Sequence, residues 1–316
     1  MLAVITCYFN PTNCPFRLRN YNNFRKEIAS EKVDLYVIEL VFGSQKFEII
    51  PESENLKRIR TQDMMFQKER MLNILLDELP EKYTSVCWMD CDLIFAQNDW
   101  SLRIEKALKE SKVVQPYYWC AGIPSCEIIR TSGSQVDYIR SSESGNFRRS
   151  FSSVHESSSS WINYHAGHVG YVWAARRDFL DKHRFYDVII TGAGDLFMAL
   201  AYMGHFDFLD YEPSLKSLNK TFTDHFLDWG FSVYEDVHGK VGHTSDLLLH
   251  MWHGDIHERN YLLHSECLQN SNFNPNKDLI LGDDLCWHWG RENKKLSDPI
   301  SHIFKNTTGP RDLNTF

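Results

Sequence analysis

The chain has 316 residues, which is long enough for one large domain or two small ones, and its hydrophobic fraction of 43% is that of a globular protein. Its net charge of −8 and isoelectric point near 6.0 argue against nucleic-acid binding by the whole surface. The cysteines form no CxxC pair, which argues against a zinc ribbon, and several lie in apolar runs that suit reduced thiols, so we expect a cytoplasmic protein.

The N-terminal part of the chain alternates predicted strands and helices. Residues 2–9 predict a strand, 16–29 a helix, 33–40 a second strand and 62–79 a helix with apolar residues at helical spacing. This order is typical of a doubly wound α/β fold. The chain begins on a strand and has no apolar run long enough to cross a bilayer, so we expect neither a signal peptide nor a transmembrane segment.

Two carboxylates follow the next apolar run. Within the run 86–95, a short apolar segment predicts a buried strand that ends in Asp90 and Asp92, and further apolar residues follow them. In open α/β sheets, ligands bind beyond the carboxyl ends of the strands, and two unpaired charges there would cost several kcal/mol. A divalent cation such as Mg²⁺ or Mn²⁺ would compensate them. The alternative interpretation is that residues 90–92 form a solvated turn without a metal.

The middle of the chain loses this regular pattern. Residues 100–110 predict a helix and 113–117 a strand, but 120–160 is rich in serine, shows no periodicity and contains interspersed arginines. Such a composition disfavours a packed core, and a long insertion of this kind is usually functional or disordered. We therefore expect residues 120–160 to form a mobile lid or acceptor loop. The arginines are Arg130, Arg140, Arg148 and Arg149.

Regular patterns return after the insertion. Residues 167–180 predict a strand of small residues that leads into a helix, and Asp195 follows the glycine-containing turn 192–194 and opens an apolar helix. Glycines beside a helix N-terminus let a backbone or ligand come close, although Asp195 could simply cap that helix. Further predicted elements are a helix over 221–236, a strand over 247–254, a helix over 258–269 and a frayed polar tail from Arg291.

Taken together, these motifs resemble those of GT-A glycosyltransferases. The resemblance extends from Leu2 to Trp289 and depends on the Asp90/Asp92 run, the block 167–180, Asp195 and His253, in that order of specificity. It implies a single GT-A (Rossmann-like) domain over residues 1–290, in which helices sandwich a mixed, mostly parallel sheet. Residues 291–316 would form the C-terminal tail.

The resemblance also implies a set of functional residues. Asp90, Asp92 and His253 would hold Mn²⁺ or Mg²⁺ against the diphosphate of a nucleotide-sugar, expected to be a UDP-sugar, and His253 fits this position better than His250 because it ends its strand before a glycine. Asp195 would be the catalytic base of an inverting transfer to a hydroxyl acceptor. The donor-binding candidates are Tyr8, Phe9, Asn10, Arg60, Lys68, Asp90 and Gly170.

Several of these assignments have alternatives. Residues 8–10 could be ordinary strand-end packing, and Lys68 could form a surface ion pair. A metal-dependent nucleotidyltransferase would also use carboxylates at a strand end, but the turn 10–13 is not the glycine-rich loop that it would need. A non-catalytic sugar-binding protein is a third possibility. The acceptor could be a glycan, a protein side chain, a lipid-linked sugar or a hydroxymethylated DNA base.

Overall fold

The computed structural model describes nine stretches of the chain. These are residues 1–50, 55–123, 147–156, 167–211, 215, 218–253, 267–269, 271–290 and 294–306. Most of the helix expected over 258–269 lies outside them, as do residues 124–146 and 157–160 of the serine-rich segment.

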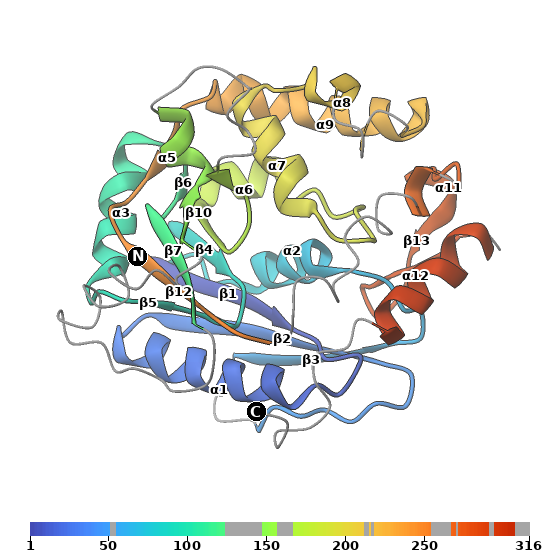
Figure 1. Ribbon diagram of the computed structural model, residues 1–316, viewed down its shortest axis with the longest axis horizontal. Coiled ribbons are helices and arrows are strands. Elements are labelled where there is room, and N and C mark those ends of the chain that lie inside the picture. Colours follow the sequence, from blue (N-terminus) through green and yellow to red (C-terminus); the bar gives the residue numbers. More distant parts are fainter. Residues whose placement is uncertain are drawn as a thin grey trace.

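A seven-stranded sheet forms the centre of the molecule (Figure 1). Neighbouring strands are parallel except at β10, which is antiparallel to both β4 and β6. The predicted mixed, mostly parallel sheet flanked by helices is therefore confirmed. In spatial order the strands are β11 (Val241–His243), β6 (Val113–Gln115), β10 (Val172–Arg176), β4 (Ser85–Met89), β1 (Leu2–Tyr8), β2 (Asp34–Phe42) and β3 (Leu56–Thr61).

Helices cover both faces of this sheet, and each face has its own hydrophobic core. Side chains of β1 alternate between the two cores, as expected for a strand buried on both faces. One face is covered by α2 (Lys68–Glu78), α6 (Arg177–His183), α7 (Gly194–Met203), α8 (Phe208–Tyr211) and α9 (Lys220–Val237). The other is covered by α1 (Pro15–Ser30), α3 (Trp100–Glu110) and a second sheet, and Figure 1 shows α1 and α2 on opposite sides.

The second sheet has five strands and receives the chain directly from β4. The expected strand does end just before the two aspartates, but the apolar residues after them belong to a different sheet. The chain leaves the large sheet at Met89, turns through residues 90–92 and enters the second sheet at Leu93. Both apolar halves are buried, but in different sheets, so the two aspartates lie in the turn between them. The strands are β5 (Leu93–Phe95), β12 (Leu247–Met251), β7 (Trp119–Ile123), β8 (Phe147–Ser150) and β9 (Gly167–His168).

Two expectations need correction. The helix expected over 62–79 begins only at Lys68, and it is preceded by strand β3, whose alternating burial at Ile59 and Thr61 is a strand signal that the prediction missed. Within the serine-rich segment, residues 120–123 and 147–150 belong to strands, and α5 (Phe151–Glu156) buries Phe151 completely. Those parts are packed, contrary to expectation.

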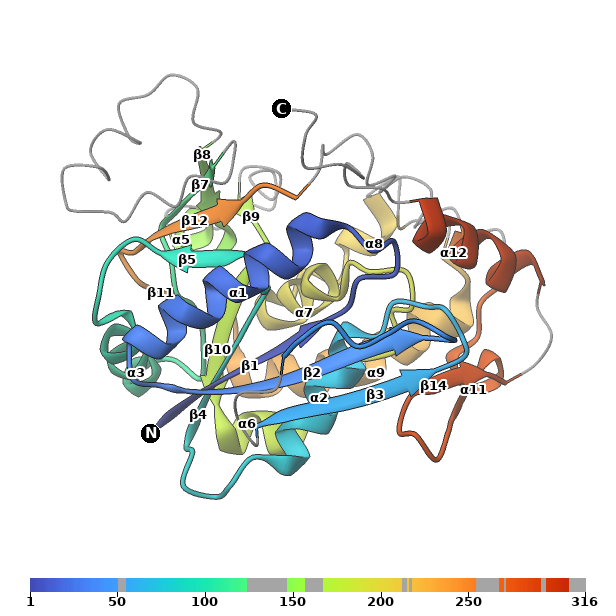
Figure 2. The same cartoon turned by 90° about the horizontal axis from the view of Figure 1, so that it is seen from below.

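The C-terminal region is more structured than its polar composition predicts. The hairpin of β13 (Leu279–Leu281) and β14 (Trp287–Trp289) follows the short helix α11 (Pro275–Asp278). Instead of fraying, the chain then forms α12 (Lys294–Asn306), which buries Leu296 and Ile300. Figure 2 shows this helix beside the hairpin, at the end of the molecule where β3 finishes.

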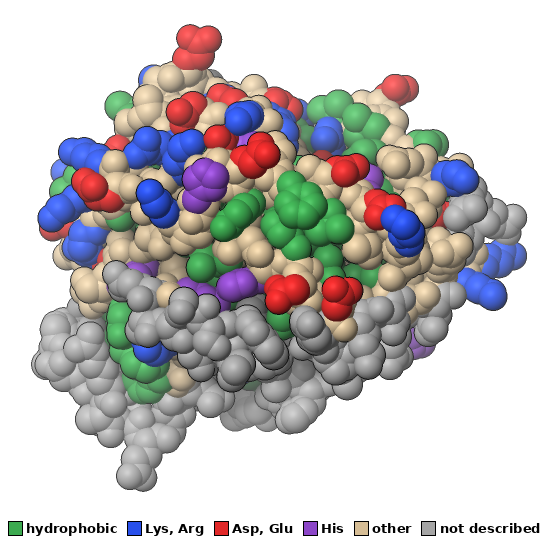
Figure 3. Space-filling model, turned by 90° about the horizontal axis from the view of Figure 1, so that it is seen from above, with side chains coloured by type: hydrophobic (Ala, Val, Ile, Leu, Met, Phe, Trp, Pro, Cys, Tyr) green, Lys and Arg blue, Asp and Glu red, His purple; other side chains and the backbone are tan. Residues whose placement is uncertain are grey.

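None of the helices described is long and apolar enough to span a membrane. The seven cysteines in the described stretches are all free thiols. Figure 3 shows the face above α8 and α9, where acidic and basic side chains are interspersed around a group of hydrophobic ones.

Candidate metal centre and adjoining lysine cluster

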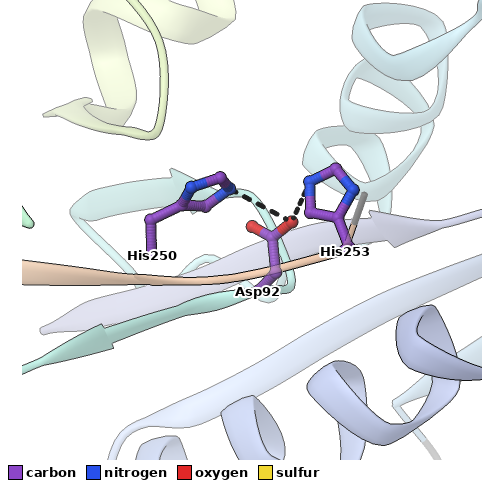
Figure 4. Close-up of side chains that lie close together, drawn as sticks. All are labelled: Asp92, His250 and His253. Carbon is purple, nitrogen blue, oxygen red and sulfur yellow. Dashed lines mark ion pairs between the residues drawn. The ribbon is translucent and has the colours of Figure 1, made fainter. Parts of the chain in front are cut away.

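Asp92, His250 and His253 converge at one end of the second sheet (Figure 4). Antiparallel pairing of β12 with β5 places His250 opposite Leu93, and the Met251 amide donates a hydrogen bond of 2.8 Å to the Asp92 carbonyl. This pairing brings the Asp92 carboxylate between the two imidazoles. Its Oδ2 lies 3.0 Å from Nε2 of His253 and 3.6 Å from Nε2 of His250.

These three residues fit a divalent transition metal. One ligand atom from each lies within 4.8 Å of the others, and Asp92 Oδ1 is buried with no hydrogen-bond partner among the described residues. Burial alone would raise the pKa of Asp92, but the two histidines outweigh it and hold that pKa well below its usual range. Two imidazole nitrogens and one carboxylate suit Mn²⁺, Fe²⁺, Co²⁺ or Zn²⁺ better than Mg²⁺, which prefers oxygen ligands.

Helix α1 holds the strand end that carries both histidines. The buried Asn20 side chain donates hydrogen bonds to the carbonyls of Met251, at 3.4 Å, and Trp252, at 3.1 Å. The Trp252 ring meets the edge of Phe16, with centroids 5.1 Å apart. The backbone between His250 and His253 is thus fixed by a helix far away in sequence.

A second cluster surrounds Lys68, the first residue of α2. Its Nζ lies 2.8 Å from Asp90 Oδ1 and 3.0 Å from Asp195 Oδ2. Burial would lower the pKa of Lys68, but the carboxylates of Asp195 and Asp90 outweigh it and hold that pKa well above its usual range. The ammonium group therefore carries its charge at neutral pH and joins the carboxylate of Asp90, in the turn after β4, to that of Asp195, in the first turn of α7.

Asp195 lies in the first turn of α7, but it does not cap this helix. The N-cap is Ala193, which makes no side-chain capping bond, while the Asp195 carboxylate is turned to Lys68. Burial is the main influence that raises the pKa of Asp195, and Lys68 opposes it. A carboxylate with a raised pKa is a stronger proton acceptor than an ordinary one.

Glu69 lies beneath this cluster and was not anticipated from the sequence. Its side chain is 1% exposed, and neither carboxylate oxygen has a hydrogen-bond partner in the described part of the chain. A Cβ added at Gly194 would lie 2.3 Å from Glu69 Oε1, so only glycine leaves room for this carboxyl group at the start of α7. Burial, reinforced by Asp195 and Asp90 and opposed by Lys68, raises the pKa of Glu69 to about 8.

The segment 168–171 connects the two clusters. A Cβ at Gly170 would lie 3.0 Å from His168 Cε1 and 3.5 Å from Asp195 Oδ2, so the glycine backbone lies close to Asp195. Tyr171 has a φ of +82°, a backbone conformation that residues other than glycine rarely adopt. Its ring stacks on His168 with centroids 3.9 Å apart and lies 5.1 Å from the ring of His250. The metal triad and the lysine cluster are thus parts of one continuous site.

The structure brings together many of the residues singled out in the sequence. Asp92 and His253 meet as expected, while Asp90 is paired with Lys68 and lies outside the metal triad. His250, ranked below His253 in the sequence, approaches the same carboxylate. In the sequence, the only local sign that His250 belongs to the metal triad is its position three residues before His253 near a strand end.

Other predicted donor-binding residues make contacts outside these two clusters. Tyr8 and Asn10 are buried and donate to the same Glu48 oxygen at 2.6 Å and 3.0 Å, and Asn10 also binds the Cys14 backbone. Phe9 meets the edge of Phe66. Arg60 is on the edge strand β3, separated from β4 by β1 and β2, where its guanidinium donates to the Gly43 carbonyl.

Comparison with known proteins gives only distant structural likenesses. No protein-family model matches the chain, and no curated protein sequence is similar to it. The fold is similar to that of S. aureus TarS in complex with UDP-GlcNAc, with 9% identity, a TM-score of 0.40 and coverage of 87% of this chain and 72% of that one.

Two other solved structures show the same kind of likeness. A 4-diphosphocytidyl-2C-methyl-D-erythritol synthase from Anaerococcus prevotii has 11% identity and a TM-score of 0.34, with coverage of 78% of this chain and 87% of its own. Drosophila β1,4-galactosyltransferase 7 with manganese, UDP-Gal and xylobiose has 10% identity and a TM-score of 0.25, with coverage of 59% and 54%. Likenesses at this level carry no weight for the activity of this chain.

Proposed function

We propose that the protein transfers a sugar from a nucleotide-sugar, expected to be a UDP-sugar, to a hydroxyl acceptor with the help of a divalent metal. One observation carries this proposal: the Asp92–His250–His253 triad and the Asp195 carboxylate belong to one continuous site beside the carboxyl end of β4. In open α/β sheets that edge is where ligands bind. A metal site and a partly buried proton acceptor are the two groups that such a transfer needs.

In this proposal the chain itself moves the proton. The acceptor oxygen forms a bond to the anomeric carbon, the bond from that carbon to the diphosphate oxygen breaks, and its electron pair leaves with the nucleoside diphosphate. The acceptor proton goes to Asp195, whose raised pKa suits it to this step. Lys68 orients Asp195 and Asp90. An attack opposite the leaving group inverts the anomeric configuration.

The metal would be held by Asp92, His250 and His253. When bound, it would act as a Lewis acid that neutralises charge on the leaving diphosphate. We keep Asp90 and Gly170 in the donor site, because Asp90 pairs with Lys68 and the Gly170 backbone lies beside Asp195. The surroundings of Tyr8, Asn10 and Arg60 give no support to their direct contact with the donor.

A metal-dependent nucleotidyltransferase is the second candidate, because it too would use the strand-end carboxylates. A thermal-shift series with UDP, GDP and CMP, each with and without Mn²⁺, distinguishes the possibilities. Stabilisation by UDP that requires Mn²⁺ supports the proposed donor class. Release of UDP from a UDP-sugar, lost on Asp92→Asn, supports transfer, whereas release of pyrophosphate from a nucleoside triphosphate would favour the second candidate. Binding of sugars without either reaction would indicate a non-catalytic protein.

A further inference from the structure

Arg148 shares a face of the second sheet with the metal triad. In the register of β7 and β8 it lies opposite Cys120, and in the register of β12 and β7 His250 lies opposite Gly122. Paired residues project from the same face of a sheet, and so do residues two apart along one strand. Arg148 and His250 are therefore on one face, two strands and two residues apart, with their Cα atoms about 12 Å from each other.

The neighbouring Arg149 is on the opposite face and has a structural role. Its guanidinium lies 4.7 Å from the Tyr118 ring centroid, and its Nη2 donates a hydrogen bond of 2.6 Å to the Ser153 carbonyl. Arg148, by contrast, is exposed and makes no hydrogen bond or ion pair with any residue that the structure describes. Its charge is thus not neutralised by the described part of the protein.

Gly122 lies between Arg148 and the triad on this face, and no described residue crowds it. Gly122 is exposed, and a Cβ added there would have no atom within 4 Å. Burial is the main influence that raises the pKa of the Cys120 thiol; among weaker ones, Asp92 raises it and Arg148 lowers it. Asp92 and Arg148 are therefore both near enough to the buried Cys120 to influence its pKa.

We propose that Arg148 and the metal triad together bind an anionic oxygen group of the substrate, a phosphate or a carboxylate, above Gly122. A guanidinium binds such groups through two parallel hydrogen bonds, and a cation at the triad would attract the same group from the other side. This inference rests on the proposed function, which supplies the metal. The group belongs either to the diphosphate of the donor or to an anionic acceptor.

The test measures anion binding by isothermal titration in the presence of saturating Mn²⁺. The probes are UDP and inorganic phosphate, the second on both UDP-free and UDP-saturated protein. The variants are Arg148→Gln, Arg148→Lys and the matched control Arg149→Gln, which removes the same charge from the opposite face. We expect Arg148→Gln to weaken binding of one probe by about tenfold or more, because it removes charge-assisted hydrogen bonds. Arg148→Lys should be intermediate, since it keeps the charge but not the planar fork.

Each outcome has a defined meaning. Weaker UDP binding assigns the group to the donor, whereas weaker phosphate binding alone assigns it to the acceptor. If wild type binds phosphate through Arg148 but does not bind UDP, the inference stands and the proposed donor class fails. Equal affinities of wild type and Arg148→Gln for both probes would overturn the inference, as would equal losses in the Arg148→Gln and Arg149→Gln variants. No binding of either probe by wild type would reject both proposals.

Discussion

Asn20 is a single side chain on which the geometry of the metal triad depends. Its amide holds the two carbonyls between His250 and His253. Removing such a supporting residue typically costs about 10–100-fold in metal affinity. We expect Asn20→Ala to weaken Mn²⁺ binding by at least about tenfold, as measured by titration calorimetry.

Asn73 offers a matched control for this prediction. It is equally buried and donates hydrogen bonds of 3.0 Å to the Phe185 carbonyl and 2.9 Å to Asp187, away from the triad. Both alanine variants should lose about 1–3 kcal/mol of folding free energy, because each leaves buried groups without partners. Only Asn20→Ala should change metal affinity, and equal Mn²⁺ affinities of the two variants would show that Asn20 is merely structural.

Asp195 can be tested by the substitution that preserves its shape. Asparagine cannot accept the acceptor proton, so Asp195→Asn should reduce turnover by at least about a hundredfold. Because Asp195 is outside the metal triad, Mn²⁺ affinity should stay within about twofold of wild type. The measurement is UDP release together with the anomeric configuration of the product. Near-normal turnover, or a product with retained configuration, would exclude Asp195 as the base.

At the scale of elements, the packing of α2 against the start of α7 encloses the Glu69 carboxyl group. Its pKa of about 8 in the folded protein lies above the ordinary value of 4.5. The folded state therefore holds this proton more tightly than the unfolded state does. The resulting stability is fully present below pH 4.5 and is lost as the pH rises through about 8.

Glu69→Gln should abolish this pH dependence, because the amide fills the same space and does not ionise. We expect the variant to gain on the order of a few kcal/mol relative to wild type between pH 5 and pH 9, as measured by guanidinium unfolding at each pH. Glu78→Gln, at the exposed end of the same helix, is the control and should follow the wild-type profile. Parallel pH profiles for wild type and Glu69→Gln would mean that the carboxyl group is ionised throughout.

At the scale of the whole molecule, local sequence patterns predicted the elements but not how they associate. Apolar periodicity predicted α1, α3 and α9 to within two residues of their ends. The end of β4 before the two aspartates was predicted, but the entry of residues 93–95 into a second sheet was not, because two short buried runs look the same whether they join one sheet or two. The same limit applies to the site: Asp195 was proposed from its turn, but its pairing with Lys68 is a contact between distant segments.

This arrangement makes metal binding a property of the whole fold. The triad joins the turn between the two sheets to a strand far along the chain, so the unfolded chain cannot present the same three ligands together. A ligand that binds only the folded state stabilises it by about 2.7 kcal/mol at one hundred times its dissociation constant.

Mn²⁺ should therefore raise the melting temperature of wild type, and Mg²⁺ at the same concentration should raise it less, because two of the ligands are imidazoles. Asp92→Asn should remove the Mn²⁺ effect, whereas Asp224→Asn, which alters an exposed ion pair on α9, should keep it. An equal Mn²⁺ shift in the Asp92→Asn variant would place the metal elsewhere and remove the basis for the proposed transfer.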